Sequence, residues 1–148
     1  MPTAFEPNMS CIFCRIVDGD LPSRTVYETD DAVAFLDANP LAAGHTLVVP
    51  SEHYETVGEL PPETAGALFE TVSAVTPRIE RAIDADGTTV AVNNGEAAGQ
   101  EVPHTHVHVV PRFDGDGNGP IHRLFSTRPS LSDAELDAIA ADIRGATE

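Results

Sequence analysis

The sequence predicts an α+β fold, with a mostly antiparallel sheet, one long helix and a C-terminal helix. Short apolar runs typical of strands outnumber the helical patterns, and only one long helical pattern interrupts them. Strand and helix do not alternate as they do in a doubly wound parallel sheet. At 148 residues, 41% of them hydrophobic, the chain is long enough for one domain with its own core.

The first third of the chain predicts a short helical turn followed by three strands. The turn covers Cys11 to Val17, and turn-forming residues separate it from strands at Thr25 to Glu28 and Ala32 to Leu36. A loop over residues 37–44 precedes the continuous apolar run His45 to Pro50. Such a run is typical of a buried strand.

Two segments carry helical signals. Pro61-Pro62 suit a helix start, and apolar residues recur at helical spacing from there to Ile83, which predicts one long amphipathic helix. Near the C-terminus, Ser132 and Glu135 form a capping box that opens the final helix.

Between the two helices lie two further strands. The first is expected at Thr88 to Asn93, and a glycine-bearing loop over residues 95–99 follows it. The second carries three histidines and ends at Pro111. The tail over residues 112–131 is mostly loop.

The charge balance is strongly acidic. Twenty-four acidic residues oppose eight basic ones, and the sequence has no lysine, which gives a formal charge of −16. Self-repulsion of this size would strain a small domain unless salt screens it, so we expect a halophilic protein with a salt-rich cytoplasmic location. Extended nucleic-acid binding is disfavoured because phosphates demand clustered cations. No membrane span or secretory leader is expected, and a small molecule is the expected partner.

Three histidines alternate in an apolar run at His104, His106 and His108. On a β-strand this spacing places all three imidazoles on one face and Val107 and Val109 on the other. Neighbouring rings about 6.6 Å apart would repel if charged, so they cannot all be protonated near neutral pH. Neutral imidazole is a nucleophile, a base or a metal ligand.

Cys11 and Cys14 are the only cysteines, and their spacing brings both sulfurs to one side of a helical turn. His53 and one histidine of the row would complete a Cys₂His₂ zinc site. Local spacing alone favours a reduced cysteine pair packed in the core equally well, and a redox dithiol less.

The histidine row ends a longer pattern, Asn93-x-Gly95-x-x-x-Gly99-Gln100-x-Val102-x-His104-x-His106-x-His108-Val109-Val110. This pattern closely resembles the signature of the histidine triad (HIT) superfamily of nucleotide hydrolases and transferases. The resemblance covers most of residues 11–112, which would be the core of a single HIT domain over residues 1–148. Residues 113–148 would then form a C-terminal loop and helix.

The resemblance implies a homodimer whose subunits share one continuous sheet. It also implies that His106 attacks the α-phosphorus of an adenosine or other purine nucleotide conjugate and forms a covalent nucleotidyl-histidine, which water hydrolyses. Substrates of this kind are nucleoside phosphoramidates, aminoacyl-adenylates and dinucleoside polyphosphates. Fixed donors beside the phosphate would lower the barrier as charge develops there.

The resemblance further assigns roles to individual residues. Gln100 would bind the phosphate or the leaving group, and His108 would bind a phosphate oxygen. The expected substrate-binding residues are Phe13, Ile16, Leu21 and Leu36 around the base, Asp37 at the ribose, and His45, Asn93, Gly99, Glu101 and Val102 near the phosphates and leaving group. The Hint-like branch with a Cys-x-x-Cys turn holds a structural zinc, for which the ligands here would be Cys11, Cys14, His53 and His104.

Two positions depart from the commonest pattern of the family. Thr105 stands where an apolar residue is usual. Glu101 stands where a close relative often has serine near the leaving group, and a carboxylate there disfavours a highly charged leaving group. Phosphoramidates or aminoacyl-adenylates would therefore fit better than polyphosphates.

Two rival functions remain open at this point. One is a nucleotide-binding regulatory or scaffold protein with the same fold and little turnover. The other is a zinc hydrolase that uses two or three of the histidines as catalytic ligands.

Overall fold

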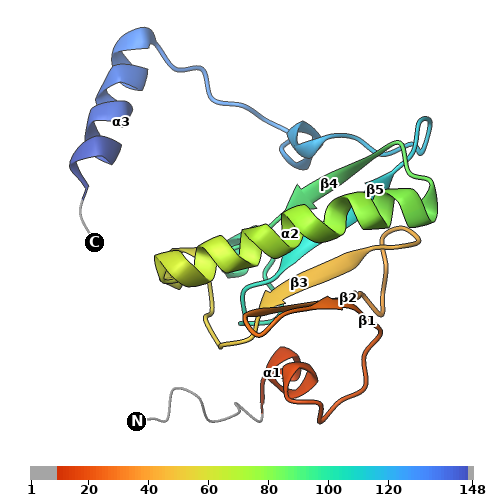
Figure 1. The fold of residues 1–148 in the computed structure, drawn as a ribbon. Helices are drawn as coiled ribbons and strands as arrows, with labels where there is room; N and C mark the ends of the chain where they lie inside the picture. Colours follow the sequence, from red (N-terminus) through yellow and green to blue (C-terminus); the bar gives the residue numbers. More distant parts are fainter. Residues whose placement is uncertain (1–9, 147–148) are drawn as a thin grey trace. The chain divides into compact units, whose positions relative to one another are not determined.

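The computed structural model describes residues 10–146, which form two compact units, one ending at Asp116 and one beginning at Gly117. The first unit holds a five-stranded sheet in the order β1-β2-β3-β5-β4, with every neighbouring pair antiparallel (Figure 1). The predicted α+β class is confirmed. The assignment of the whole chain to one domain stays a prediction.

Strands β1 to β4 lie within two residues of the bounds that the sequence predicted, whereas β5 begins later than the histidine row indicated. The strands are β1 (Thr25–Glu28), β2 (Ala32–Leu36), β3 (Thr46–Pro50), β4 (Gly87–Ala91) and β5 (Val107–Arg112). The central strand β3 is buried at all five positions, which explains why its sequence is apolar without alternation.

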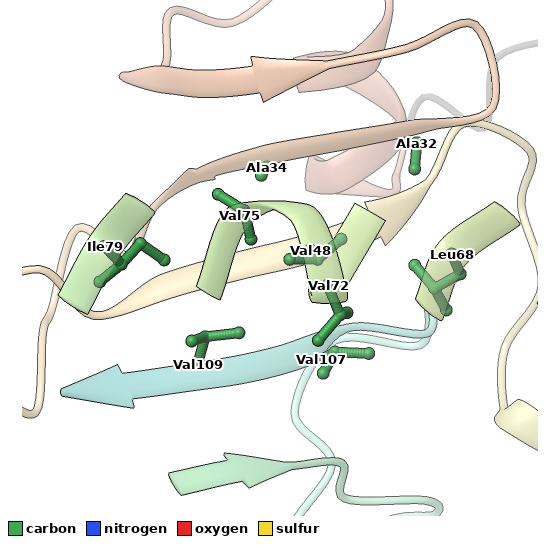
Figure 2. Packing of buried hydrophobic residues seen from close by; sticks show 9 residues of the cluster. All are labelled: Ala32, Ala34, Val48, Leu68, Val72, Val75, Ile79, Val107 and Val109. Carbon is green, nitrogen blue, oxygen red and sulfur yellow. The ribbon is translucent and has the colours of Figure 1, made fainter. Parts of the chain in front are cut away.

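Helix α2 (Pro62–Ile83) covers one face of the sheet. Its buried side chains meet the small and β-branched residues of three strands, as Figure 2 shows. This cluster consists of Leu68, Val72, Val75 and Ile79 from the helix and Ala32, Ala34, Val48, Val107 and Val109 from the strands. Because strand side chains alternate, the neighbours of these residues point to the opposite face.

The opposite face carries the short helix α1 (Ile12–Val17). Cys11, Phe13 and Cys14 pack there against Val33, Phe35, Leu47 and Val49 of the sheet. The alternation of β2 and β3 therefore builds two clusters, one under each helix, and the α1 side is the side of the candidate site.

Three short 3₁₀ turns complete the described chain, at η2 (Val57–Glu59), η3 (Glu96–Ala98) and η4 (Ile121–Leu124). The second unit contains η4 and helix α3 (Asp133–Gly145), which begins at the predicted capping box between Ser132 and Glu135. Among residues 10–146, no helix has both the length and the apolar character needed to cross a bilayer.

Candidate active site

A cleft of about 490 Å³ opens on the α1 side of the sheet. Ten of the residues predicted for the site line it: Phe13, Ile16, Leu36, Asp37, Asn93, Gly99, Glu101, Val102, His106 and His108. Leu21, His45 and Gln100 were also predicted but do not line it. The cleft thus brings the apolar residues of α1 together with the glycine loop and two of the three histidines.

Sequence reasoning missed several lining residues. Phe35 and Leu47 could have been found from strand alternation, because each faces the same side as the residue two positions away. Among residues 10–146, Arg24 is the only lysine or arginine that lines the cleft, and it lies on the loop before β1. No sequence signal marks it.

Phe13 forms the apolar wall of the cleft beside the histidines. Its ring meets Phe35 edge-on at 5.6 Å between centroids and meets His106 at 5.0 Å. The rings of Phe13 and Phe35 therefore give this side of the cleft an apolar, aromatic character.

The histidine row differs from its prediction in one respect. Strand β5 begins at Val107, so His104 and His106 precede the strand and only His108 lies within it. The ladder between β3 and β5 stops at Val48 and Val107. Beyond this point a side chain replaces the backbone ladder: Nε2 of His104 lies 3.0 Å from the Pro50 carbonyl at the end of β3.

His106 nevertheless keeps the orientation that the alternation predicted. Its Nδ1 lies 2.7 Å from the carbonyl oxygen of His104. A carbonyl only accepts, so Nδ1 carries the proton and donates it. Nε2 is then left with a free lone pair on a residue that lines the cleft, and this is the form required of a nucleophile.

His108 is held by a second hydrogen-bond chain. The backbone N–H of Leu41 donates to Nδ1 of His45 at 3.0 Å, so the His45 proton sits on Nε2. That nitrogen lies 3.0 Å from Nδ1 of His108 and donates to it. His108 therefore carries its proton on Nε2.

Burial favours the neutral forms of the His45 and His108 rings. Loss of water lowers the pKa of His45, although the Asp37 carboxylate, 3.7 Å away, opposes this. Burial also lowers the pKa of His108 to about 4, with repulsion from His106 and His45 adding to it and Asp37 opposing. His108 thus presents an N–H donor without a net charge.

A second cluster lies beside the cleft and unites the four predicted metal ligands, Cys11, Cys14, His53 and His104. The sulfur of Cys14 lies 3.2 Å from Nδ1 of His53, and Nδ1 of His53 lies 3.2 Å from Nδ1 of His104. Nδ1 of His104 lies 3.4 Å from the Cys11 sulfur and 3.5 Å from the Cys14 sulfur.

These distances fit a tetrahedral zinc ion. Zn–N bonds near 2.05 Å and Zn–S bonds near 2.3 Å imply N···N and N···S separations of about 3.3 and 3.6 Å at tetrahedral angles. Nε2 of His104 donates to Pro50, which leaves Nδ1 free to bind, and burial lowers the pKa of His104 to about 4. The donor set therefore fits a metal, and the backbone carbonyl of His104, a member of this set, also orients the His106 ring.

Gln100 does not reach into the cleft. Its Oε1 accepts from the backbone N–H of Gly95 at 2.7 Å, and its Nε2 donates to the carbonyls of Glu55 at 2.7 Å and Val102 at 2.9 Å. The side-chain amide of Gln100 therefore makes three hydrogen bonds, all of them to backbone groups of the protein.

The chain matches the family model described as HIT domain over residues 18–115. An uncharacterised HIT-like protein of Methanocaldococcus jannaschii is 38% identical over 135 residues, which cover 91% of this chain and 99% of that protein. Adenylylsulfatase HINT3 of Arabidopsis thaliana is 42% identical over 106 residues, covering 72% of this chain and 54% of that one.

Solved structures agree. A HIT family protein from Bacillus subtilis superposes with a TM-score of 0.84 at 38% identity, covering 93% of this chain and 97% of that chain. A zinc-bound histidine triad protein from Mycobacterium smegmatis superposes with a TM-score of 0.70 at 36% identity, covering 92% and 96%.

Proposed function

The chain belongs to the HIT domain family, and we propose that it is a hydrolase that cleaves adenosine or other purine nucleotide conjugates at the α-phosphorus through a covalent intermediate on His106. The observation that carries this proposal is the hydrogen bond that fixes the proton of the His106 ring on Nδ1. This Nδ1 proton is donated to the His104 carbonyl, so Nε2 keeps a free lone pair on a residue that lines the cleft.

In the proposed reaction Nε2 of His106 forms a bond to phosphorus. The P–N or P–O bond to the leaving group breaks, and the leaving group departs with that electron pair and takes up a proton. The Nε2 proton of His108 supports the phosphoryl oxygen on which charge develops. Water then attacks phosphorus, the P–N bond to His106 breaks, and the nucleoside monophosphate is released.

The charges in the cleft favour a leaving group with little negative charge. Two carboxylates, Asp37 and Glu101, line the cleft together with the single guanidinium of Arg24. Each like-charge pair about 7 Å apart costs about 0.6 kcal/mol even at the dielectric constant of water. Amine leaving groups of phosphoramidates, and aminoacyl groups, therefore fit better than polyphosphates.

The Cys11, Cys14, His53 and His104 cluster would hold a structural zinc ion. With four protein ligands the ion has no open position, so it would brace the segment that carries His106 and not activate water. A homodimer with one sheet shared between two copies, as the family resemblance implies, is part of the same proposal.

The test compares His106→Ala with the wild-type protein on an adenosine phosphoramidate. We expect the variant to lose at least a thousandfold in AMP release and to form no covalent adenylyl adduct by mass spectrometry, while its zinc content is unchanged. His122→Ala, a change at an exposed histidine of η4, is the matched control and should retain full activity. Retained turnover in His106→Ala would refute the nucleophile.

Two further outcomes separate the rivals. A wild-type protein that binds AMP but releases none from any conjugate would be a binding protein. A zinc hydrolase with catalytic histidine ligands predicts that Cys11→Ser keeps its activity, whereas the proposed structural ion predicts that this variant releases the metal and loses stability.

A further inference from the structure

The segment His53-Tyr54-Glu55, between β3 and η2, contributes a residue to the metal cluster although it has no helix or strand of its own. A ligand on irregular backbone needs other contacts to hold it in place. Two backbone carbonyls of this segment accept hydrogen bonds from elsewhere in the chain, that of Tyr54 from Thr105 and that of Glu55 from Gln100.

Thr105 supplies the first of these contacts. Its backbone N–H donates to the Tyr54 carbonyl at 2.7 Å, and its hydroxyl donates to the same oxygen at 2.9 Å. Thr105 is only 1% exposed and lies between His104 and His106 in the sequence. An apolar residue at this position could not make the second bond.

Gln100 supplies the other contact. Its Nε2 reaches the Glu55 carbonyl and the Val102 carbonyl, and its Oε1 holds the Gly95 N–H of the glycine loop. One side chain therefore ties the metal-ligand segment to the loop that lines the cleft.

We propose that Thr105 and Gln100 are positioning residues, which hold residues 53–55 against the histidine segment so that one hydrogen-bond network places both the metal ligand His53 and the nucleophile His106. Gln100 acts through this network and makes no contact with the leaving group. The catalytic part of this inference rests on the proposed function, whereas the part that concerns the metal does not.

The metal part is tested on the zinc-loaded protein with Thr105→Val, which keeps the volume and removes the hydroxyl. Mutation of a residue that supports a metal ligand by hydrogen bonds typically weakens metal affinity 10- to 100-fold. We expect zinc release to a chelator to be at least tenfold faster, and the thiolate absorption bands of the Co²⁺-loaded protein to shift.

Two variants serve as controls. Thr105→Ser keeps a hydroxyl and should restore slow release. Thr71→Val removes another buried threonine hydroxyl, one that bonds to the Ala67 carbonyl within α2, and should release zinc at the wild-type rate. Wild-type release and an unshifted Co²⁺ spectrum in Thr105→Val would overturn the role of Thr105.

Gln100→Ala is tested on metal release and on catalysis. It should also speed zinc release, and this measurement decides the metal part if Thr105→Val does not fold. For catalysis, kcat/KM is measured on adenosine conjugates whose leaving groups differ in basicity.

A positioning role predicts that Gln100→Ala lowers kcat/KM by the same factor for every leaving group. A contact with the leaving group predicts a factor that grows with the basicity of that group, and this result would overturn the role of Gln100. If the wild-type protein turns over none of the conjugates, the proposed function fails, and zinc release alone then decides the network.

Discussion

At the scale of single residues, the proton positions on three histidine rings follow from backbone groups whose roles are fixed. The His104 carbonyl can only accept, and the Leu41 N–H can only donate. These two groups leave Nε2 of His106 free and place a proton on Nε2 of His108. The cleft is therefore lined by one ring with an Nε2 lone pair and one ring with an Nε2 proton, 5.0 Å apart between centroids.

The pKa of His108, lowered by burial to about 4, predicts how stability depends on pH. In the unfolded chain this histidine titrates near 6.5. Between about pH 4 and 6.5 the unfolded state therefore binds a proton that the folded state does not, so the free energy of unfolding rises with pH across this window. Denaturant unfolding at a series of pH values should show this rise, and His108→Asn should make it less steep, because the lowered pKa of His45 still contributes.

Nuclear magnetic resonance gives a direct check on the same ring. The His108 ring signals of the folded, zinc-loaded protein should titrate with a midpoint near 4. A midpoint at 6.5 or above would mean that burial does not keep His108 neutral.

At the scale of elements, the sequence predicted strand bounds well where the side chains of the strand and its flanking turns determine them. The β-branched and apolar runs of β1, β2 and β3 had nearly correct bounds, because each run is flanked by turn residues. The start of β5 was wrong by several residues. The end of a ladder depends on where the partner strand stops bonding, and no residue of the histidine row encodes that.

The same reasoning separates the site residues that could be foreseen from those that could not. The metal cluster was predictable from the family pattern, and its four ligand atoms do converge. The inward-facing contacts of Gln100 were not predictable, because they depend on where the backbone of residues 53–55 lies. Thr105 was visible as a departure from the pattern, but its partner Tyr54 is 51 residues away.

Gly44 shows how one turn sets the entry to β3. Its φ of +93° lies in the left-handed region, and a Cβ there would come within 2.7 Å of Cγ1 of Ile83. An L-residue in such a conformation costs about 1–2 kcal/mol, and the side chain of Ile83 must shift as well. We expect Gly44→Ala to lower the free energy of unfolding by about 2 kcal/mol, measured by denaturant unfolding.

Gly66→Ala is the matched control for this change. Gly66 lies within α2, and a Cβ there would meet nothing within 4 Å. Alanine is favoured over glycine in a helix by about 1 kcal/mol, so this variant should be more stable than the wild type. Equal effects of the two substitutions would refute the account of Gly44.

At the scale of the whole molecule, the large negative net charge opposes folding. A formal charge of −16 on 148 residues opposes compaction through the mutual repulsion of carboxylates. Local pairs such as Arg112 with Asp116, at 2.8 Å, offset this only where they occur, because the chain has eight basic residues against twenty-four acidic ones. Dissolved cations must supply the remaining screening.

This imbalance predicts a salt-dependent melting temperature. Raising KCl from about 0.1 M to 1 M shortens the screening length from about 10 Å to about 3 Å, which is less than the spacing between most surface charges. We expect Tm to rise by about 5 °C or more, measured by calorimetry on the zinc-loaded protein. Sucrose at the same osmolality is the control, because it is excluded from the protein surface but screens no charge. If sucrose raised Tm as much as KCl, repulsion between carboxylates would not be what limits stability, and the expectation of a halophilic protein would lose its physical basis.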